Sequence, residues 1–369
     1  MAIAAGVPRR RSLRLWQAHL VLGALLCGLY VFVPPFAGSP IVMNILGLAP
    51  VVAIVVGLRR YRPASPGPWW CFAAGLSLFW LGDLYTYSYE LLLGREVPFP
   101  SLGDAAYILV YPALMAGLLL IVRRRNPESD RAGVIDSLII TLGLALVSWV
   151  ALIAPYLHDD ELSGVAKLVS IAYPLGDILL LAAAIRLSVD AGKREPAFFL
   201  LVWSIVALLL TDFIYGLVTL NGAYVGQLSL DAGWIAFYLL WGAAALHPSM
   251  RELEQPAPDR ELRLKPLRLA LLMCASVIAP VIEMLQEIEQ TDDLIVVNVA
   301  SILLFGLVVV RMTGLVRQQE RSVSSERVLR AAGDALVAAT RRDEIHHAAL
   351  DAARSLVDRR ATAMLCLAE

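Results

Sequence analysis

Ten long apolar stretches fill residues 14 to about 314, and the loops between them alternate between basic and non-basic. A helix of about 20 apolar residues crosses the ~30 Å hydrocarbon core of a bilayer, and backbone amides in lipid must be hydrogen-bonded within their own segment. The composition agrees, because 59% of the residues are hydrophobic, 17% are charged and the mean hydropathy is +0.68. The sequence therefore predicts an all-α polytopic membrane protein.

The predicted spans are 14–33, 41–58, 69–92, 104–122, 134–154, 164–187, 196–219, 230–247, 267–286 and 293–314. Arginine and lysine cluster before the first span and after the second, fourth, sixth, eighth and tenth, whereas Arg95 is the only clear basic residue of the alternate loops. The positive-inside rule then places both termini in the cytoplasm of a plasma-membrane protein. The bilayer is the expected partner, and a nucleic acid is not, because the basic residues are spread along one membrane face.

The predicted membrane region contains repeated helical hairpins. Residues 104–112 (DAAYILVYP) match 231–239 (DAGWIAFYL), and 170–174 (SIAYP) shares their tyrosine. The helices that precede the first and last of these units also match, at 81–85 (LGDLY) and 210–215 (LTDFIY). We therefore expect a hairpin repeat of about 63 residues with the same orientation each time.

Ionisable side chains inside the predicted spans are candidates for a binding site. A charge near the bilayer centre costs at least about 2.5 kcal/mol, so such residues should be paired, protonated or turned to the bundle interior. One hypothesis is an outward-facing pocket for a cationic or amphipathic small ligand. Its residues would be Asp83, Asp104, Asp212, Asp231, Tyr85, Tyr111 and Tyr238.

Each of these residues also has a purely structural interpretation. Asp104 and Asp231 lie where the fourth and eighth spans begin, which suits helix N-capping. Asp83 and Asp212 would be hydrogen-bonded to a tyrosine or the backbone of a neighbouring helix. The aromatic residues would form a belt at the lipid interface.

The segment after the last span is predicted to be helical. Apolar residues recur at Val316, Val323, Val328, Leu329, Leu336 and Val337. This spacing is close to seven, with a drift near residue 328, and indicates either a homodimer through the helix at 315–340 or a single amphipathic helix resting on the next domain. Residues 315–328 are interpreted as a linker or signalling helix.

The run LRAAGDALVAATRRDEIHHAALDAARSLVDRRATAMLCLAE resembles the helix-helix-strand opening of a GAF domain, over residues 329–369 only. The resemblance implies an α/β domain that begins here and is incomplete, because one strand cannot form a stable sheet. We therefore expect the chain to be a fragment or a disrupted gene product. The pocket residues of such a domain would lie beyond Glu369.

The membrane region resembles the N-terminal part of actinobacterial multidomain signalling proteins. The resemblance lies in GDLYTYSYELL, PSLGDAAYILVYPALMAGLLLIVRRR, VSIAYPLGDILLLAAAIRL and DAGWIAFYLLWGAAALHPSM, and it covers residues 14 to about 320. In that family the region precedes GAF or PAS modules and then GGDEF and EAL domains, which make or degrade cyclic di-GMP. The resemblance implies a bacterial membrane-embedded sensory module that acts in signal transduction.

Two other functions remain open, namely a small-molecule or ion transporter and a membrane anchor with a dimerisation role. We expect no enzyme, cofactor or metal in this chain. It holds no Gly-rich phosphate loop, no nucleophile with a base at suitable spacing, no metal-ligand set and neither a Gly-Gly-Asp-Glu-Phe nor a Glu-Ala-Leu motif. Catalysis, as a diguanylate cyclase or phosphodiesterase, would belong to a full-length relative.

Overall fold

The computed structural model describes residues 14–32, 39–125, 131–189, 194–222, 228–255, 272–278, 280–282 and 294–338, together with Ile345 and Leu350. Almost all of these residues are helical, and no strand occurs among them. The chain divides into two compact units, Met1–Phe305 and Gly306–Glu369. The strand predicted at 361–367 lies outside the described residues, and so does most of the predicted GAF-like segment.

Along the chain the elements are α1 (Leu15–Phe32), α2 (Ser39–Tyr61), α3 (Gly67–Leu93), α4 (Leu102–Arg125), α5 (Arg131–Ser148), the π-helical turn η1 (Trp149–Ile153), α6 (Ala154–His158), α7 (Gly164–Val189), α8 (Pro196–Leu220), α9 (Leu228–Leu246), the 3₁₀ turn η2 (Pro248–Glu252) and α11 (Leu294–Ala338). A shorter apolar helix runs over 272–282. Each helix overlaps one of the stretches that the sequence predicted as a span.

Seven helices among the described residues are long and apolar enough to cross a membrane. They cover 15–32, 40–61, 102–125, 132–158, 164–189, 196–220 and 295–317. The protein is therefore an all-α, multi-pass membrane protein. The predicted count of ten spans stays a prediction: α3 is rich in aromatic and hydroxyl residues, α9 offers only Leu230–Leu246, and the ninth predicted span lies partly outside the described residues.

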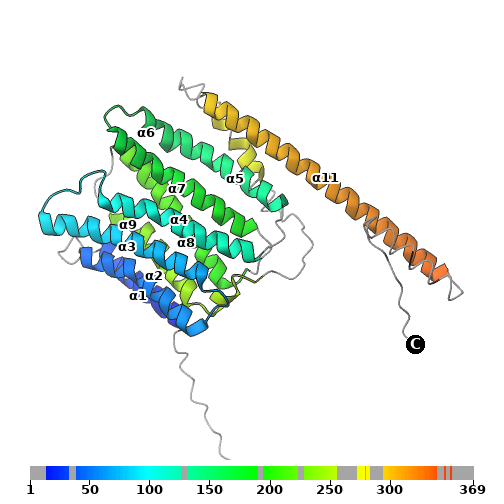
Figure 1. Ribbon diagram of the computed structural model, residues 1–369, viewed down its shortest axis with the longest axis horizontal. Coiled ribbons are helices and arrows are strands. Elements are labelled where there is room, and N and C mark those ends of the chain that lie inside the picture. The colour runs from blue at the N-terminus through cyan, green and yellow to red at the C-terminus, as the bar shows by residue number, and fades with distance from the viewer. Residues whose placement is uncertain are drawn as a thin grey trace, which may run out of the picture. The chain divides into compact units, whose positions relative to one another are not determined.

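The helices of the first unit run side by side as an antiparallel bundle (Figure 1). Helix α3 packs against α2 and α4, α4 packs against α7, and α8 joins α7 to α9. Helix α9 also contacts α2 and α1, so that it is surrounded by three of its neighbours. The two related hairpins thus pack on helices outside the repeat: α3–α4 on α2 and α7, and α8–α9 on α1, α2 and α7.

Small residues let these helices approach closely. A side chain at Gly117 would collide with the ring of Phe72, and one at Gly57 would meet the carbonyl oxygen of Ala245. Such small residues at helix contacts are typical of membrane bundles, where lipid supplies no hydrophobic drive for association. The interior between them is filled by aromatic rings, including Phe79, whose ring lies 5.2 Å from that of Tyr238.

The surface of the bundle is apolar over the length of its helices. Leu25 on α1 is 67% exposed, Leu168 on α7 is 69% exposed and Trp203 on α8 is 62% exposed. A water-soluble surface would not carry so many large apolar side chains, whereas lipid tails are as apolar as leucine. The exposed apolar side chains and the lengths and hydropathies of the helices thus both indicate that the bundle surface faces lipid.

Positive charge gathers at one end of the bundle, which we call the arginine end. Its described members are Arg14, Arg59, Arg60, Arg62, Arg123, Arg124, Arg125, Arg186, Arg194 and Arg251. Arg125 is buried: its Nε donates to the carbonyl of Leu253, its Nη1 lies 3.5 Å from the carbonyl oxygen of Leu187, and its guanidinium lies 5.2 Å from the centre of the Phe198 ring. These contacts bring the ends of α4 and α7, the start of α8 and the segment after α9 together.

Helix α11 spans the boundary between the two units. It continues for 45 residues without a break. The predicted domain limits, at 314/315 and 328/329, both fall inside this single helix.

Candidate functional site

Asp83 accepts two hydrogen bonds from tyrosines at the end of the bundle opposite to the arginine end. Its carboxylate lies 2.8 Å from the Tyr107 hydroxyl of α4 and 2.6 Å from the Tyr238 hydroxyl of α9. Asp83 is 3% exposed and Tyr238 is fully buried. Glycine at position 82 lets the Tyr107 ring lie directly on α3, because a Cβ there would be 2.5 Å from that ring.

Asp212 of α8 has the same kind of surroundings. Its carboxylate accepts a 2.7 Å hydrogen bond from the Trp234 indole of α9 and a longer one, 3.4 Å, from the Tyr111 hydroxyl of α4. The Tyr111 ring rests on α7, where a Cβ at Gly176 would come within 2.6 Å of it. The structural interpretation of Asp83 and Asp212, a hydrogen bond to a tyrosine of another helix, therefore describes what both carboxylates do.

The two hairpins exchange their tyrosines. Within the first hairpin, Asp83 of α3 accepts a hydrogen bond from Tyr107 of α4. Within the second, Asp212 of α8 accepts one from Trp234 of α9. Tyr107 and Trp234 are equivalent, because each lies three residues after the aspartate near the start of its helix. The second donor comes from the other hairpin: Tyr238 of α9 donates to Asp83, and Tyr111 of α4 donates to Asp212. The sequence repeat is thus accompanied by a reciprocal pair of contacts.

The aspartates that open the second helices also accept tyrosine hydroxyls, and neither is itself the N-cap. Asp104 lies three residues after Ser101, with which it forms a capping box, because its carboxylate accepts the Ser101 backbone N–H at 2.7 Å. Its other oxygen accepts the Tyr173 hydroxyl of α7 at 2.7 Å. Asp231 comes after the start of α9 at Leu228 and accepts the Tyr30 hydroxyl of α1 at 2.8 Å. The N-cap interpretation is therefore corrected for both.

Asp177 of α7 lies close to Asp212 and Tyr111. Its Oδ1 is buried and has no hydrogen-bond partner among the described residues.

Six of the seven residues of the predicted pocket belong to this set of hydrogen bonds. Tyr85 is the exception, because its ring packs on Tyr89 at 5.6 Å and over Gly103. Sequence reasoning missed Tyr30, which no repeat marks. The sequence repeat made Tyr173 the equivalent of Tyr111 and Tyr238. In the structure, however, the Tyr173 hydroxyl donates to Asp104 near the start of α4.

We call this set, with Asp83, Asp104, Asp177, Asp212, Asp231 and their aromatic donors, the carboxylate end. Within the described residues its hydrogen-bond donors are neutral hydroxyl, indole and amide groups, and none of its carboxylates forms a salt bridge. A carboxylate with only neutral donors is either an anion that can attract a cation or a protonated acid. No group of three or more His, Cys, Asp or Glu side chains in the described residues could hold a metal ion.

The bundle and its polar interior define a helical multi-pass membrane protein with a repeated hairpin. Comparison of the chain with protein-family models, with curated proteins and with solved structures gave no match. The ligand role of the carboxylate end and the resemblance to signalling proteins accordingly stay predictions.

Proposed function

We propose that the protein is a membrane-embedded sensory module that relays a signal through α11 to a cytoplasmic domain. The observation that carries the proposal is the continuity of α11. Its apolar part, Ile295–Arg317, is long enough to cross a bilayer, and the same helix then runs on to Ala338. The extension of 21 residues is about 31 Å long, and a transporter has no need of such a rod beyond its last span.

Apolar residues at the end of the span and in the extension favour a homodimer. Val316 is 55% exposed, Val323 42% and Leu329 58%, although each occupies the predicted seam. Val316 and Val323 are seven residues apart and lie near one face of the helix, whereas Leu329, six residues further on, lies about 120° round from them. A second copy of α11 would cover Val316 and Val323, and a pair of helices can transmit rotation or a change of register.

The remaining parts of the proposal follow from charge and resemblance. The arginine end would face the cytoplasm, with both termini on that side of the plasma membrane. The carboxylate end would then face outward and receive a small cationic ligand, and the output would be the synthesis or breakdown of cyclic di-GMP by domains that follow a GAF-like module.

Insertions in α11 test the relay. Residues 1–338 would be fused to a diguanylate cyclase domain that is active only as a dimer, and cyclic di-GMP would be measured in cells. One or two residues inserted after Ser324 turn the exit direction by about 100° each and should change output, whereas seven residues restore the seam and should restore output. Equal output across the series would leave an anchor or a transporter as the function.

Cross-linking tests the dimer directly. In a chain without its native cysteines, Val323→Cys should form a disulfide-linked dimer in membranes. Ser324→Cys, which lies about 100° further round the helix, serves as the matched control. Equal cross-linking at both positions would show random collision instead of a paired seam.

Reporter fusions test the orientation. Fusions after Arg124 and Arg251 should behave as cytoplasmic, and fusions after Asp160 and Gly222 as external. The opposite result at any two sites would reverse the proposed topology.

A further inference from the structure

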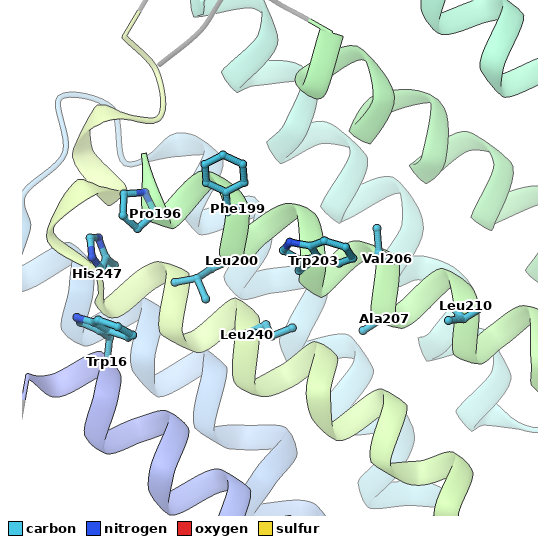
Figure 2. Close-up of a pocket in the computed structure, with 10 residues that line it drawn as sticks. All are labelled: Trp16, Pro196, Phe199, Leu200, Trp203, Val206, Ala207, Leu210, Leu240 and His247. Carbon is cyan, nitrogen blue, oxygen red and sulfur yellow. The ribbon is translucent and has the colours of Figure 1, made fainter. Parts of the chain in front are cut away.

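The outer face of α8 carries an apolar groove that the proposed relay does not use. The groove has a volume of about 770 Å³ and is lined by Trp16, Pro196, Phe199, Leu200, Trp203, Val206, Ala207, Leu210, Leu240 and His247. These residues come from α1, α8, α9 and the turn after α9. Figure 2 shows that Trp16, Pro196 and His247 gather at one end, with Leu210 at the other.

The length of the groove matches one leaflet of a bilayer. The distance along α8 from Phe199 to Leu210 is about 16 Å, and half of the hydrocarbon core is about 15 Å. Phe199 is 49% exposed and Leu210 is 57% exposed, so the groove opens towards the apolar surroundings of the bundle. It begins where α8 begins, at the arginine end, and therefore at the level of lipid headgroups.

The end of the groove that lies at headgroup depth is polar. The indole Nε1 of Trp16 is buried and has no hydrogen-bond partner among the described residues. The ring of His247 lies 5.3 Å from that of Trp16, and its Nδ1 accepts the backbone N–H of Ser249. Its Nε2 therefore carries the proton of the neutral ring and is a donor. Burial lowers the pKa of the His247 ring, the positive charge of the nearby Arg14 lowers it further, and Glu195 opposes both.

We propose that this groove binds one anionic phospholipid from the leaflet at the arginine end. An acyl chain would lie along Phe199, Trp203 and Leu210, and the phosphate would meet Arg14 and the N–H groups of Trp16 and His247. A purely apolar partner, such as a helix of a second copy, would offer no acceptor to the Trp16 and His247 N–H groups at the end of the groove. The chemistry at both ends of the groove thus favours a lipid.

Native mass spectrometry of the full chain in detergent tests this site. The probes are phosphatidylglycerol and phosphatidylcholine with identical acyl chains. The wild-type protein should retain one phosphatidylglycerol in preference to phosphatidylcholine. Ala207→Phe fills the groove and should lower that occupancy about tenfold, which corresponds to about 1.4 kcal/mol. Leu179→Phe, a matched change at an exposed position of α7, should leave it unchanged.

A second variant separates the headgroup from the chain. Arg14→Gln should bring the occupancies of the two lipids close together without abolishing either. If Ala207→Phe lowers the amount of folded protein, Val206→Trp, which fills the groove from its exposed side, is used as the groove-filling variant instead. Equal lipid retention in the wild-type and filled proteins would overturn the proposal. So would a lipid-free wild-type dimer that becomes a monomer on filling, which would assign the groove to a second copy. None of these outcomes depends on the sensory role of α11.

Discussion

The two ends of the bundle satisfy their charged side chains in opposite ways. At the carboxylate end, Asp83 and Asp212 accept hydrogen bonds from neutral hydroxyl and indole groups of other helices. At the arginine end, Arg125 donates to backbone carbonyls and lies on a phenyl ring, and Arg124 forms a 2.9 Å salt bridge with Glu254. Acceptors for a cation are available wherever helices end, because their last carbonyls lack partners. A carboxylate inside the span has no such groups nearby and depends on aromatic donors supplied by the sequence.

Removing a carboxylate should have the largest effect, because two buried donors lose their acceptor at once. Asp83→Ala leaves the Tyr107 and Tyr238 hydroxyls unsatisfied, and we expect a loss of roughly 2–4 kcal/mol in unfolding free energy. Asp83→Asn keeps an acceptor and should lose less than half of that. Detergent-titrated unfolding measures both, and equal losses would show that packing, not hydrogen bonding, governs this position.

At the arginine end a single residue holds several segments. Arg125→Met keeps the length of the side chain but removes its donors to Leu253 and Leu187, so we expect a loss of about 1.5–3 kcal/mol. Arg123→Met, on the exposed side of the same turn, is the control and should change the stability by less than about 0.5 kcal/mol. Similar losses in both variants would mean that the buried contacts of Arg125 contribute little.

The reciprocal tyrosines allow the two hairpins to be compared directly. Tyr238→Phe removes a 2.6 Å hydrogen bond from a fully buried site and should cost about 1–1.7 kcal/mol, near the upper limit measured in membrane bundles. Tyr111→Phe removes a 3.4 Å contact and should cost about 0.5 kcal/mol or less. The same unfolding assay measures both losses. A larger loss in Tyr111→Phe than in Tyr238→Phe would contradict the assignment of the stronger hydrogen bond to Tyr238.

The smallest expected effect is a pH dependence at the arginine end. Partial burial raises the pKa of Glu254, and Arg124 opposes this. The folded chain therefore keeps this proton at pH values where the unfolded chain has lost it, so stability should fall as pH rises from about 4.5 through the raised pKa. The slope should vanish in Glu254→Gln and become steeper in Arg124→Ala. Melting temperatures recorded across this pH range measure the slope. The same slope in the wild-type and Arg124→Ala proteins would show that the salt bridge does not influence the titration of Glu254.

The sequence predicted the helices well because membrane spans follow simple physical rules. Runs of apolar residues ended by arginines marked α2, α4 and α7, and the repeated DAAY and DAGW segments marked the starts of α4 and α9. Helix α3 is less apolar than these helices because it carries Asp83 and many aromatic and hydroxyl residues. The π-helical turn at Trp149–Ile153 had no local signal apart from the proline that follows it.

The hydrogen bonds of the site were only partly accessible to sequence reasoning. Repeated aspartates identified the acceptors, because a carboxylate in a span is costly and therefore conspicuous. The donors were harder to assign, because tyrosine is also common in the aromatic belt at the lipid interface. Tyr30 has no counterpart in the hairpins, and its contact with Asp231 joins residues 201 positions apart. Such a pairing depends on how the helices pack, which periodicity does not report.

The exchange of tyrosines between hairpins also sets an order for biosynthesis. Asp83 and Tyr238 are separated by 155 residues, so the first hairpin is made well before its partner exists. At about 5–20 residues per second the ribosome needs roughly 8–30 seconds to supply that partner. During this interval Asp83 has Tyr107 but lacks Tyr238, and Tyr111 has no Asp212 to bind. The first hairpin therefore enters the membrane as an unfinished half and reaches its final packing only when α8 and α9 arrive.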